Sequence, residues 1–282
     1  MDVSVVVTCW NGIDLIRKNL PDLLSAAKNP ANHIKEILVV DDGSTDGSPG
    51  LIRKEFPQVK IVVHKKNIGY SSVCNSGVGA ANQELVCILN ADVRPTNNFL
   101  EPALKHFIDP HVFSVSFNEG RYGPGKLAWN NGFMNIVPNN QLSDNAVESD
   151  WGSGGSAIFR KSIWEKLGGM DEIFSPYYFE DIDIGWRAIQ ENYINYWEPK
   201  AKIIHEHEQT INSDKFKLSN RKDDINIIKQ RNHLLLTWKN IYSYDRFWEH
   251  LFKYLLPRLV THPGYFKVLL AALIRKIIYH KK

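Results

Sequence analysis

Hydrophobic residues in the first third of the chain alternate between short continuous runs and amphipathic stretches. The continuous runs predict buried strands at Val3–Thr8, Glu36–Val40, Val59–His64 and Glu84–Leu89. The stretches between them predict helices from about Ile13 to Lys28, Ser48 to Glu55 and Tyr70 to Ala81. Strands that alternate with helices form βαβ units with right-handed crossovers. The pattern therefore predicts an α/β fold around a Rossmann-like, mostly parallel sheet.

The hydrophobic pattern changes in the middle of the chain. Asn, Gly and aromatic residues dominate Phe117–Trp151, which predicts a long functional loop over a sheet edge. Ordered structure is expected again at Ser156–Arg160, followed by helices around Lys161–Leu167 and from Asp181 to about Asn192. We expect one catalytic domain over residues 1–240, with a nucleotide-binding half to about 110 and an acceptor-binding half from about 111.

The last segment, residues 241–282, is predicted to be a basic helical extension. From His250 to Lys282 there are seven Lys and Arg residues and no Asp or Glu. The apolar stretches Leu251–Val260 and Val268–Ile278 are shorter than the ~20 residues that span a bilayer. Two interpretations remain open. The segment is either a basic amphipathic helix on an anionic membrane surface or a helix pair packed on the catalytic domain.

Composition and charge exclude several classes of protein. A chain of 282 residues can bury one large core, and a formal net charge of +3 gives no reason to expect nucleic acid as a partner. The three cysteines, Cys9, Cys74 and Cys87, lack metal-ligand spacing and are expected to be reduced packing residues. The chain enters a strand at once without a secretory signal pattern. We expect a cytoplasmic protein, at the inner face of the membrane if the extension binds lipid.

Acidic and amide side chains follow two of the predicted strands. Asp41 and Asp42 come after the second strand, and Asn90 and Asp92 come after the fourth. The carboxyl ends of parallel strands are where α/β sheets hold ligands. One carboxylate of the first pair can accept a hydrogen bond from a pyrimidine N3–H, although such stretches also form solvated turns. Asp92 suits Mg²⁺ or Mn²⁺ shared with substrate phosphates.

Two further positions have both a functional and a structural interpretation. Trp10, which follows Thr8 at the end of the first strand, can stack on a base or be a core aromatic residue. His205 can complete the shell of a divalent metal or be a structural histidine. Neither a Gly-x-Gly-x-x-Gly nor a P-loop pattern is present, which argues against a dinucleotide cofactor and a P-loop phosphate site.

A third acidic cluster, Glu180-Asp181-Ile182-Asp183, begins a predicted helix. Carboxylates in a first turn are favoured by the helix dipole, so capping is the structural interpretation. Three carboxylates behind three aromatic residues exceed what one cap needs. Like charges and partial burial raise the pKa of a carboxyl group, which suits a base that deprotonates a sugar hydroxyl.

Taken together, the motifs of this chain resemble those of glycosyltransferase family 2, most closely its rhamnosyltransferase-like branch. The resemblance covers roughly residues 3–240, in the expected order. The matching blocks are Val5-Val6-Val7-Thr8-x-x-Asn11, Val39-Val40-Asp41-Asp42-Gly43-Ser44-x-Asp46-Gly47-Ser48, Asn67-x-Gly69-Tyr70, Asn75-x-Gly77, Leu89-Asn90-x-Asp92, Gly154-Gly155-Ser156-Ala157-x-x-Arg160, Gly168-Gly169-Met170-Asp171-Glu172-x-Phe174, Glu180-Asp181-x-Asp183-Ile184-x-x-Arg187, His205 and Arg231-Asn232.

The resemblance implies a GT-A fold, a divalent cation (Mn²⁺ or Mg²⁺) and an inverting transfer from a nucleotide-diphosphate sugar. The donor would be UDP- or dTDP-linked, with dTDP-rhamnose as one candidate. The acceptor would be a saccharide or lipid-linked saccharide of cell-surface polysaccharide synthesis. The implied catalytic base is Asp181, with Glu180 as the alternative. The implied donor-binding residues are Thr8, Trp10, Asn11, Asp41, Asp42, Asn67, Asn90 and Asp92. The implied acceptor-binding residues are Trp151, Gly154 and Gly155, and the metal ligands are Asp92 and His205.

Two departures from the family pattern stand out. Asn90 replaces the first residue of the usual Asp-x-Asp, which removes one negative metal ligand, and Cys74 stands where relatives often have Arg. A binding protein that kept the fold without turnover is therefore a second hypothesis. A nucleotidyltransferase is a third, which the missing basic residue in Thr8–Gly12 disfavours. On the acceptor side, Tyr122, Trp129 and Trp151 can stack on sugars or pack on one another.

Overall fold

The computed structural model describes residues 1–121, 123–137, 143–205 and 222–279. In this part of the chain a nine-stranded mixed sheet has the order β3-β2-β1-β4-β10-β6-β11-β5, and β9 pairs with β11. The predicted α/β class is confirmed. The strands of this sheet are β1 (Val3–Cys9), β2 (Ile34–Asp41), β3 (Lys60–Val63), β4 (Leu85–Asn90), β5 (Val93–Pro95), β6 (Val112–Asn118), β9 (Val147–Ser149), β10 (Ser156–Arg160) and β11 (Ile194–His205).

The amino-terminal half of the sheet is parallel, as its βαβ pattern predicts. Strands β2 and β4 flank β1, and β3 lies outside β2. The crossovers are α1 (Ile13–Ala26), α2 (Ser48–Glu55) and α3 (Tyr70–Ala80). Strand β10 then runs antiparallel between β4 and β6, which makes the sheet mixed.

The side chains of each strand alternate between two apolar layers, one on each face of the sheet. Val5 and Val7 pack in the layer that contains α1 and α2, whereas Val6 packs in the layer that contains α3. Both faces are covered, which explains why the strands are continuous apolar runs rather than alternating ones. Helix α3 approaches so closely that a Cβ on Gly77 would lie 2.4 Å from a methyl carbon of Val6.

The predicted long loop at Phe117–Trp151 is wrong in part. Three strands lie in this region: β7 (Lys126–Asn130) and β8 (Phe133–Val137) form a separate antiparallel hairpin, and β9 extends the main sheet. These strands are short and half-exposed, so their hydrophobic alternation is weak. Tyr122, expected as a stacking residue, lies outside the described residues.

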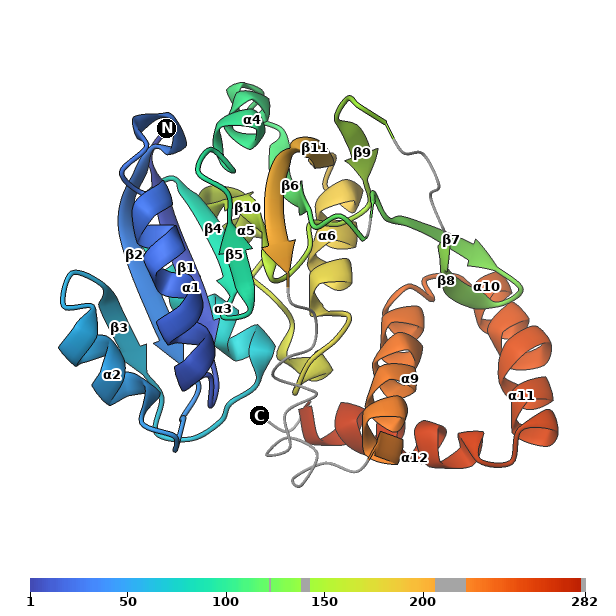
Figure 1. Cartoon of the computed structure of the whole chain (residues 1–282). Helices are drawn as coiled ribbons and strands as arrows, with labels where there is room; N and C mark the ends of the chain where they lie inside the picture. Colours follow the sequence, from blue (N-terminus) through green and yellow to red (C-terminus); the bar gives the residue numbers. More distant parts are fainter. Residues whose placement is uncertain (122, 138–142, 206–221, 280–282) are drawn as a thin grey trace.

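The remaining helical segments lie between α1 and β2, between β5 and β11, or after β11 along the chain. They are η1 (Pro30–Asn32), α4 (Glu101–Leu104), η2 (Lys105–Ile108), α5 (Lys161–Lys166), η3 (Glu172–Phe174), α6 (Glu180–Gln190), α9 (Lys222–Lys239), α10 (Tyr244–Glu249), η4 (His250–Leu255), α11 (Leu256–Thr261) and α12 (Tyr265–Tyr279). Helices α9, α11 and α12 form the part of the molecule beside the sheet domain (Figure 1). Among the described residues, no helix combines the length and apolar character that crossing a bilayer requires.

A third apolar cluster joins these late helices to the rest of the molecule. It contains Phe133 of the hairpin, Ile182 of α6, Leu235 of α9 and Val268 of α12, all buried. The interpretation of the extension as helices packed on the catalytic domain therefore holds for one face of α12. The expected domain boundary at residue 240 falls within this cluster and stays a prediction.

Candidate active site

The carboxyl ends of β1, β2 and β4 bring the predicted donor-side residues together. Thr8 of β1 is in register with Asn90 of β4, and Cys9 is in register with Asp41 of β2. Thr8, Asp41 and Asp92 are all buried. Three loops that are far apart in sequence thus begin side by side at the carboxyl ends of neighbouring strands.

The loop after β1 is tied to the loop after β2. The Asn11 amide donates to Ser44 Oγ over 2.8 Å, and the Thr45 amide donates to Asn11 Oδ1 over 2.8 Å. Asp46 accepts from the Ile13 amide over 2.9 Å and so caps α1. These contacts hold half-buried Trp10 at the rim of the strand edge. Asn11, which the resemblance implies as a nucleotide-sugar-binding residue, therefore joins two loops of the protein.

The adjacent carboxylates of Asp41 and Asp42 point to different partners. Asp42 accepts from the amides of Ile68 and Gly69 at 2.7 and 3.2 Å, which fixes the loop that carries exposed Asn67. Burial raises the pKa of the Asp42 carboxyl above its ordinary value, although the hydrogen bonds from the two amides lower it in part. Asp41 Oδ1 accepts from the Ser44 amide over 2.9 Å, whereas its buried Oδ2 has no hydrogen-bond partner. That oxygen is a buried acceptor that the surrounding protein closes off from solvent.

Asn90 lies at the centre of the site. Its Oδ1 accepts from Thr8 Oγ1 over 3.1 Å and lies 2.7 Å from the hydroxyl of Tyr70. The same hydroxyl lies 2.8 Å from the carbonyl oxygen of Gly154. A Cβ on Gly155 would lie 2.2 Å from Asn90 Nδ2, so this position needs a glycine. The Asn90 side chain is therefore fixed by the protein itself.

Asp92, His205 and Glu119 form a continuous chain of contacts. His205 Nε2 lies 3.2 Å from Asp92 Oδ1, and His205 Nδ1 lies 3.0 Å from Glu119 Oε2. Burial lowers the pKa of His205, but the two carboxylates outweigh burial and raise it to about 9. Glu119 is in turn held by the hydroxyl of Ser156.

The donor atoms of Asp92 and His205 suit a divalent cation. In an octahedral Mg²⁺ shell, with bonds of about 2.1 Å, neighbouring ligands lie roughly 3 Å apart, which the oxygen–nitrogen separation here matches. Within the described ranges, no three His, Cys, Asp or Glu side chains form a metal site alone. Glu119 lies on the far side of the imidazole and can only orient it. Further ligands would have to come from substrate oxygens or water.

The three carboxylates at the start of α6 have different environments. Asp183 pairs with Arg187 at 2.8 Å and with Lys239 at 2.7 Å, which makes it structural. Glu180 is 4 % exposed, and its Oε2 has no hydrogen-bond partner. Burial, assisted by the charge of Asp181, raises the pKa of Glu180 well above its ordinary value. Half-buried Asp181 accepts from the amides of Gly154 and Ile182 at 3.0 and 2.9 Å. Burial also raises the pKa of Asp181.

The segment that leads into α6 is held by α9. Tyr178 and Phe179 both have a φ of 76°, in the left-handed region that non-glycine residues rarely adopt. Asn232 Nδ2 lies 2.9 Å from the carbonyl oxygen of Tyr177 and 3.0 Å from that of Tyr178. Arg231 donates to the carbonyl oxygen of Ser175 over 2.6 Å. The position of Asp181 thus depends on a helix about 50 residues further along the chain.

The expected acceptor-side aromatics pack against the protein. Trp151 lies on the backbone of Gly125, where an added Cβ would lie 2.1 Å from its ring. Trp129 donates to Glu249 over 2.7 Å and lies under the guanidinium of Arg246 at 4.8 Å. Both rings belong to the third apolar cluster or border it.

Two residues at the site were not among those expected from the sequence. Tyr70 belongs to a motif of the family resemblance, but its hydroxyl contact with Asn90 needs the folded sheet. Glu119 follows β6, a strand that the sequence pattern did not predict. The apolar run Val112–Phe117 was the signal that could have placed a functional carboxylate there.

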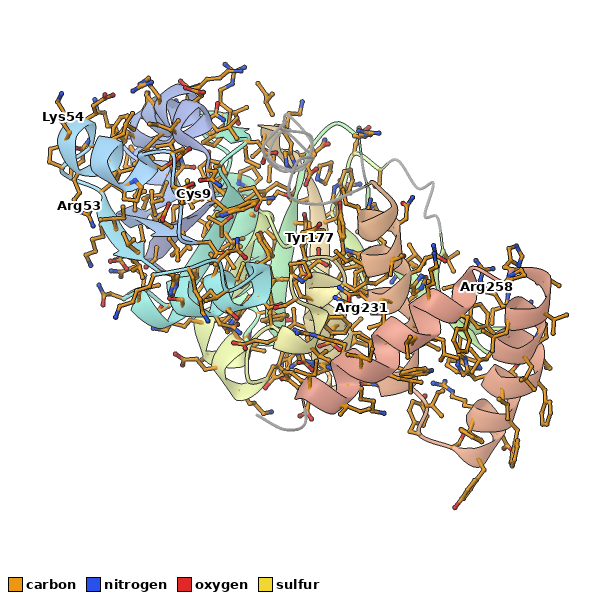
Figure 2. The ribbon with its side chains drawn as sticks, turned by 90° about the horizontal axis from the view of Figure 1, so that it is seen from below. Cys9, Arg53, Lys54, Tyr177, Arg231 and Arg258 are labelled. Atoms are coloured by element: carbon orange, nitrogen blue, oxygen red, sulfur yellow. The ribbon has the colours of Figure 1, made fainter. Side chains whose placement is uncertain are left out.

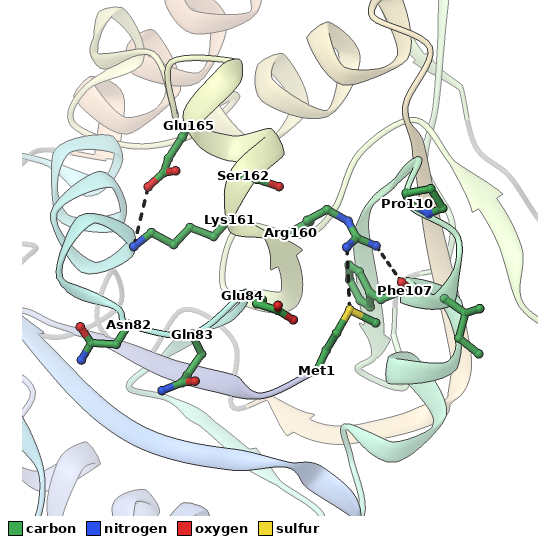
Figure 3. A pocket seen from close by; sticks show the side chains of 11 residues that line it. Met1, Asn82, Gln83, Glu84, Phe107, Pro110, Arg160, Lys161, Ser162 and Glu165 are labelled. Carbon is green, nitrogen blue, oxygen red and sulfur yellow. Dashed lines mark hydrogen bonds and ion pairs between the residues drawn. The ribbon is translucent and has the colours of Figure 1, made fainter.

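A pocket of about 750 Å³ lies away from this site, lined by residues just before β1 and β4 and by residues at the junction of β10 and α5. Met1, Glu84 and Arg160 are among its lining residues (Figure 3). Arg160 there donates to the carbonyl oxygens of Phe107, Asp109 and Val112. Because ligands of α/β sheets bind at the carboxyl ends of strands, this cavity is not the candidate active site.

Solved glycosyltransferases share this arrangement of strands and helices. GalNAc-T7, solved with UDP, GalNAc and Mn²⁺, aligns with a TM-score of 0.66 at 15% identity, over 84% of this chain and 48% of that one. A mannosyltransferase of Pyrobaculum calidifontis, in complex with GDP-Man and Mn²⁺, aligns with a TM-score of 0.58 at 18% identity, over 96% of this chain and 73% of that one. The fold is that of the GT-A glycosyltransferases.

The sequence then gives the family. The model of glycosyl transferase family 2 matches residues 4–168, more than half of the chain, and the chain belongs to that family. This match contains β1, the loops with Asp41 and Asp92, and Gly154.

Curated relatives agree at low identity. The pre-mycofactocin glycosyltransferase of Mycobacterium tuberculosis is 26% identical over 223 residues, which cover 73% of this chain and 43% of that protein. The N-acetylglucosaminyl-diphospho-decaprenol L-rhamnosyltransferase of the same organism is 22% identical over 241 residues, covering 72% of this chain and 75% of that protein. The chain thus spans less than half the length of the first of these relatives.

Proposed function

We propose that this chain is an inverting glycosyltransferase that moves a sugar from a nucleotide-diphosphate sugar to a saccharide acceptor. The observation that carries the proposal is one chain of contacts through Gly154. Its carbonyl oxygen meets the Tyr70 hydroxyl, which also contacts Asn90, and its amide donates to Asp181. A donor-side residue and the candidate base thus lie on opposite sides of one glycine.

The donor would bind at the carboxyl ends of β1, β2 and β4. Trp10 would stack on the nucleobase. Asp41 Oδ2, which has no hydrogen-bond partner but is closed off by the protein, would accept from a nucleobase or ribose group only after its loop moves. A Mg²⁺ or Mn²⁺ ion held by Asp92 and His205 would neutralise charge on the leaving diphosphate. Glu119 would hold the His205 ring in the orientation that this requires.

Asp181 would act as the general base on the acceptor side. It takes the proton of the acceptor hydroxyl while that oxygen bonds to the anomeric carbon and the bond from this carbon to the diphosphate oxygen breaks. The hydroxyl attacks from the side opposite to the leaving group, so the configuration at the anomeric carbon inverts. Glu180 is too buried to reach an acceptor, and Asp183 is paired with two cations.

The relatives supply candidates for the substrates. Relatives include the decaprenol-linked rhamnosyltransferase of Mycobacterium tuberculosis and an O-antigen chain rhamnosyltransferase of Salmonella anatum, which is 24% identical over 194 residues. Their names favour transfer of rhamnose and, for the first, a lipid-linked saccharide acceptor. We therefore propose a UDP- or dTDP-linked donor, with dTDP-rhamnose as one candidate, and an acceptor of cell-surface polysaccharide synthesis. A cytoplasmic location stays a prediction of the sequence.

A donor panel tests this function. Nucleotide sugars are screened by thermal shift with and without Mn²⁺, because a ligand that binds the folded state raises its melting temperature by mass action. We expect one UDP- or dTDP-sugar to give a metal-dependent shift, and Asp92→Ala to abolish the metal dependence. Activity that survives EDTA unchanged would contradict the metal role.

The second candidate function is nucleotide-sugar binding without turnover. Asn90 favours it, because its oxygen is already engaged by Thr8 and Tyr70 and adds no charge to the metal site. A hydrolysis assay of the donor identified in the panel distinguishes the two. Slow release of the nucleoside diphosphate supports transferase chemistry, and binding without any release supports the alternative.

A further inference from the structure

Exposed large hydrophobic side chains are concentrated on the late helices. Of the 19 such side chains in the described part of the chain, 13 lie between Tyr242 and Ile278. Single exposed apolar residues are normal on protein surfaces, whereas a contiguous group marks an interaction site. The longest helix of this region, α12, has most of the late group's aliphatic members.

Helix α12 is apolar on two opposite faces. Tyr265, Val268 and Ala272 are buried against the rest of the molecule. At 100° per residue the opposite face is also apolar, where a surface helix normally has polar residues. This outer face, which is 44–61 % exposed, consists of Phe266, Leu270, Leu273, Ile274, Ile277 and Ile278. Helix α12 itself lies along the lower side of the molecule in Figure 1, which is the side that Figure 2 views.

The charged residues that α12 contributes beside its outer face are all positive. Exposed Lys267 and Lys276 flank it, and the chain from His250 to Lys282 has no Asp or Glu. This one-sided charge complements an anionic surface and disfavours a second copy of the same helix, which would bring like charges together. Phosphatidylglycerol and similar lipids provide such a surface beside an apolar layer.

The length of α12 determines how it can meet a bilayer. Fifteen residues at 1.5 Å each give about 22 Å, which is less than the ~30 Å hydrocarbon core. A short helix with an apolar face and flanking lysines lies in the interface plane rather than across it.

We propose that the outer face of α12 docks on an anionic phospholipid surface, parallel to the membrane plane. The inner face links this contact to the candidate base. Arg275 donates to the carbonyl oxygen of Ile173 over 2.8 Å and to that of Glu172, in the segment that leads to Asp181. Docking would thus hold that segment beside the lipid. The inference needs no glycosyl transfer and can be tested without any donor.

Vesicle flotation of the full chain tests the docking surface. Vesicles of phosphatidylcholine alone are compared with vesicles that also contain phosphatidylglycerol, at low and high salt. We expect flotation with the anionic vesicles only, weakened by salt. Lys267→Gln combined with Lys276→Gln should weaken binding about fivefold per lysine, roughly 30-fold in all.

A matched pair of variants separates this face from general surface hydrophobicity. Leu270→Gln/Ile274→Gln/Ile277→Gln should abolish flotation, whereas Ile108→Gln/Val137→Gln/Ile136→Gln, at exposed positions elsewhere, should leave it unchanged. Circular dichroism melts confirm that both variants fold. Equal flotation of both variants overturns the proposal, as does no flotation of the wild type. Sedimentation without vesicles that shows a dimer which only the α12 variant breaks also overturns it, in favour of a second copy.

Discussion

Burial separates the three carboxylates at the start of α6, of which the family resemblance implies Asp181 as the base and Glu180 as the alternative. Asp183 forms ion pairs with Arg187 and Lys239. Glu180 is buried, and its Oε2 has no hydrogen-bond partner. Asp181 alone is both half-exposed and positioned by an amide on the acceptor side. This difference supports the choice of base.

The first prediction concerns that choice. Asp181→Asn should reduce kcat by about 10²- to 10⁴-fold while donor affinity stays within about twofold, because the amide keeps the shape and loses the basicity. Glu180→Gln is the matched control and should retain most of the turnover. Steady-state kinetics and donor titration measure both. A dead Glu180→Gln beside an active Asp181→Asn would reverse the assignment.

The second prediction concerns the stability contribution of Glu180. Burial raises its pKa in the folded state above the ordinary value of 4.5. The folded state therefore holds a proton that the unfolded state releases, and stability falls as the pH rises from about 4.5 toward the folded-state pKa. The glutamine of Glu180→Gln cannot ionise. The melting temperature of this variant minus that of the wild type should therefore increase by roughly one to several degrees as the pH rises from 4 to 7. A constant difference across this range would show that Glu180 ionises without penalty.

The sequence predicted the residues of the site better than their contacts. Asp41, Asn90 and Asp92 follow recognisable patterns and lie at the carboxyl ends of β2 and β4. Asp181 is linked to Asn90 through Gly154 and Tyr70. The run Val112–Phe117 could have placed Glu119 at the end of a strand, but its contact with His205 depends on the pairing of β6 with β11 across about 80 residues of chain. That Asp41 keeps a free buried oxygen while Asp42 holds a loop is likewise a property of the folded loops.

At the scale of elements, the parallel half of the sheet was predictable, and so were β10, α5 and α6, whereas β6 and the strands β7, β8 and β9 were not. The strands β1, β2 and β4 are buried on both faces and stand out as apolar runs. The hairpin β7–β8 and the edge strand β9 are short, and burial of one face in the third cluster defines them more than their own pattern does. Strand β11 has Pro199 and Lys200 within it, which obscures its apolar alternation.

The third prediction concerns how α9 supports α6. Asn232→Ala removes the donor that holds the carbonyl oxygens of Tyr177 and Tyr178 and should cost about 1–3 kcal/mol of stability. Because the strained segment before Asp181 is then free to relax, kcat should fall while the donor KM stays near that of the wild type. Asn32→Ala is the control, since Asn32 is equally buried and binds backbone far from the site. A kcat loss in both variants would mean that general destabilisation is the cause.

At the scale of the whole molecule, the third apolar cluster packs the late helices against α6 and the hairpin β7–β8. Leu235 and Val268 lie on either side of the expected boundary at residue 240 and share this cluster with Ile182 of α6. Arg275 adds a second link to the segment before Asp181. One face of α12 packs in this cluster, and the opposite face is apolar and exposed. A membrane contact on the exposed face would therefore be mechanically linked to the segment before Asp181.

The last prediction tests this unity. Val268→Ala, at a 2 % exposed position, should destabilise the whole chain by about 1–3 kcal/mol, whereas Phe266→Ala, at a 61 % exposed position of the same helix, should change stability by less than about 0.5 kcal/mol. Amide hydrogen exchange locates the effect. If residues 1–279 unfold as one cooperative unit, Val268→Ala accelerates exchange in β1 as much as in α12 under conditions where global unfolding dominates. Faster exchange confined to α12, with β1 unchanged, would establish that the late helices unfold as a separate unit. That result would support the predicted domain boundary at residue 240.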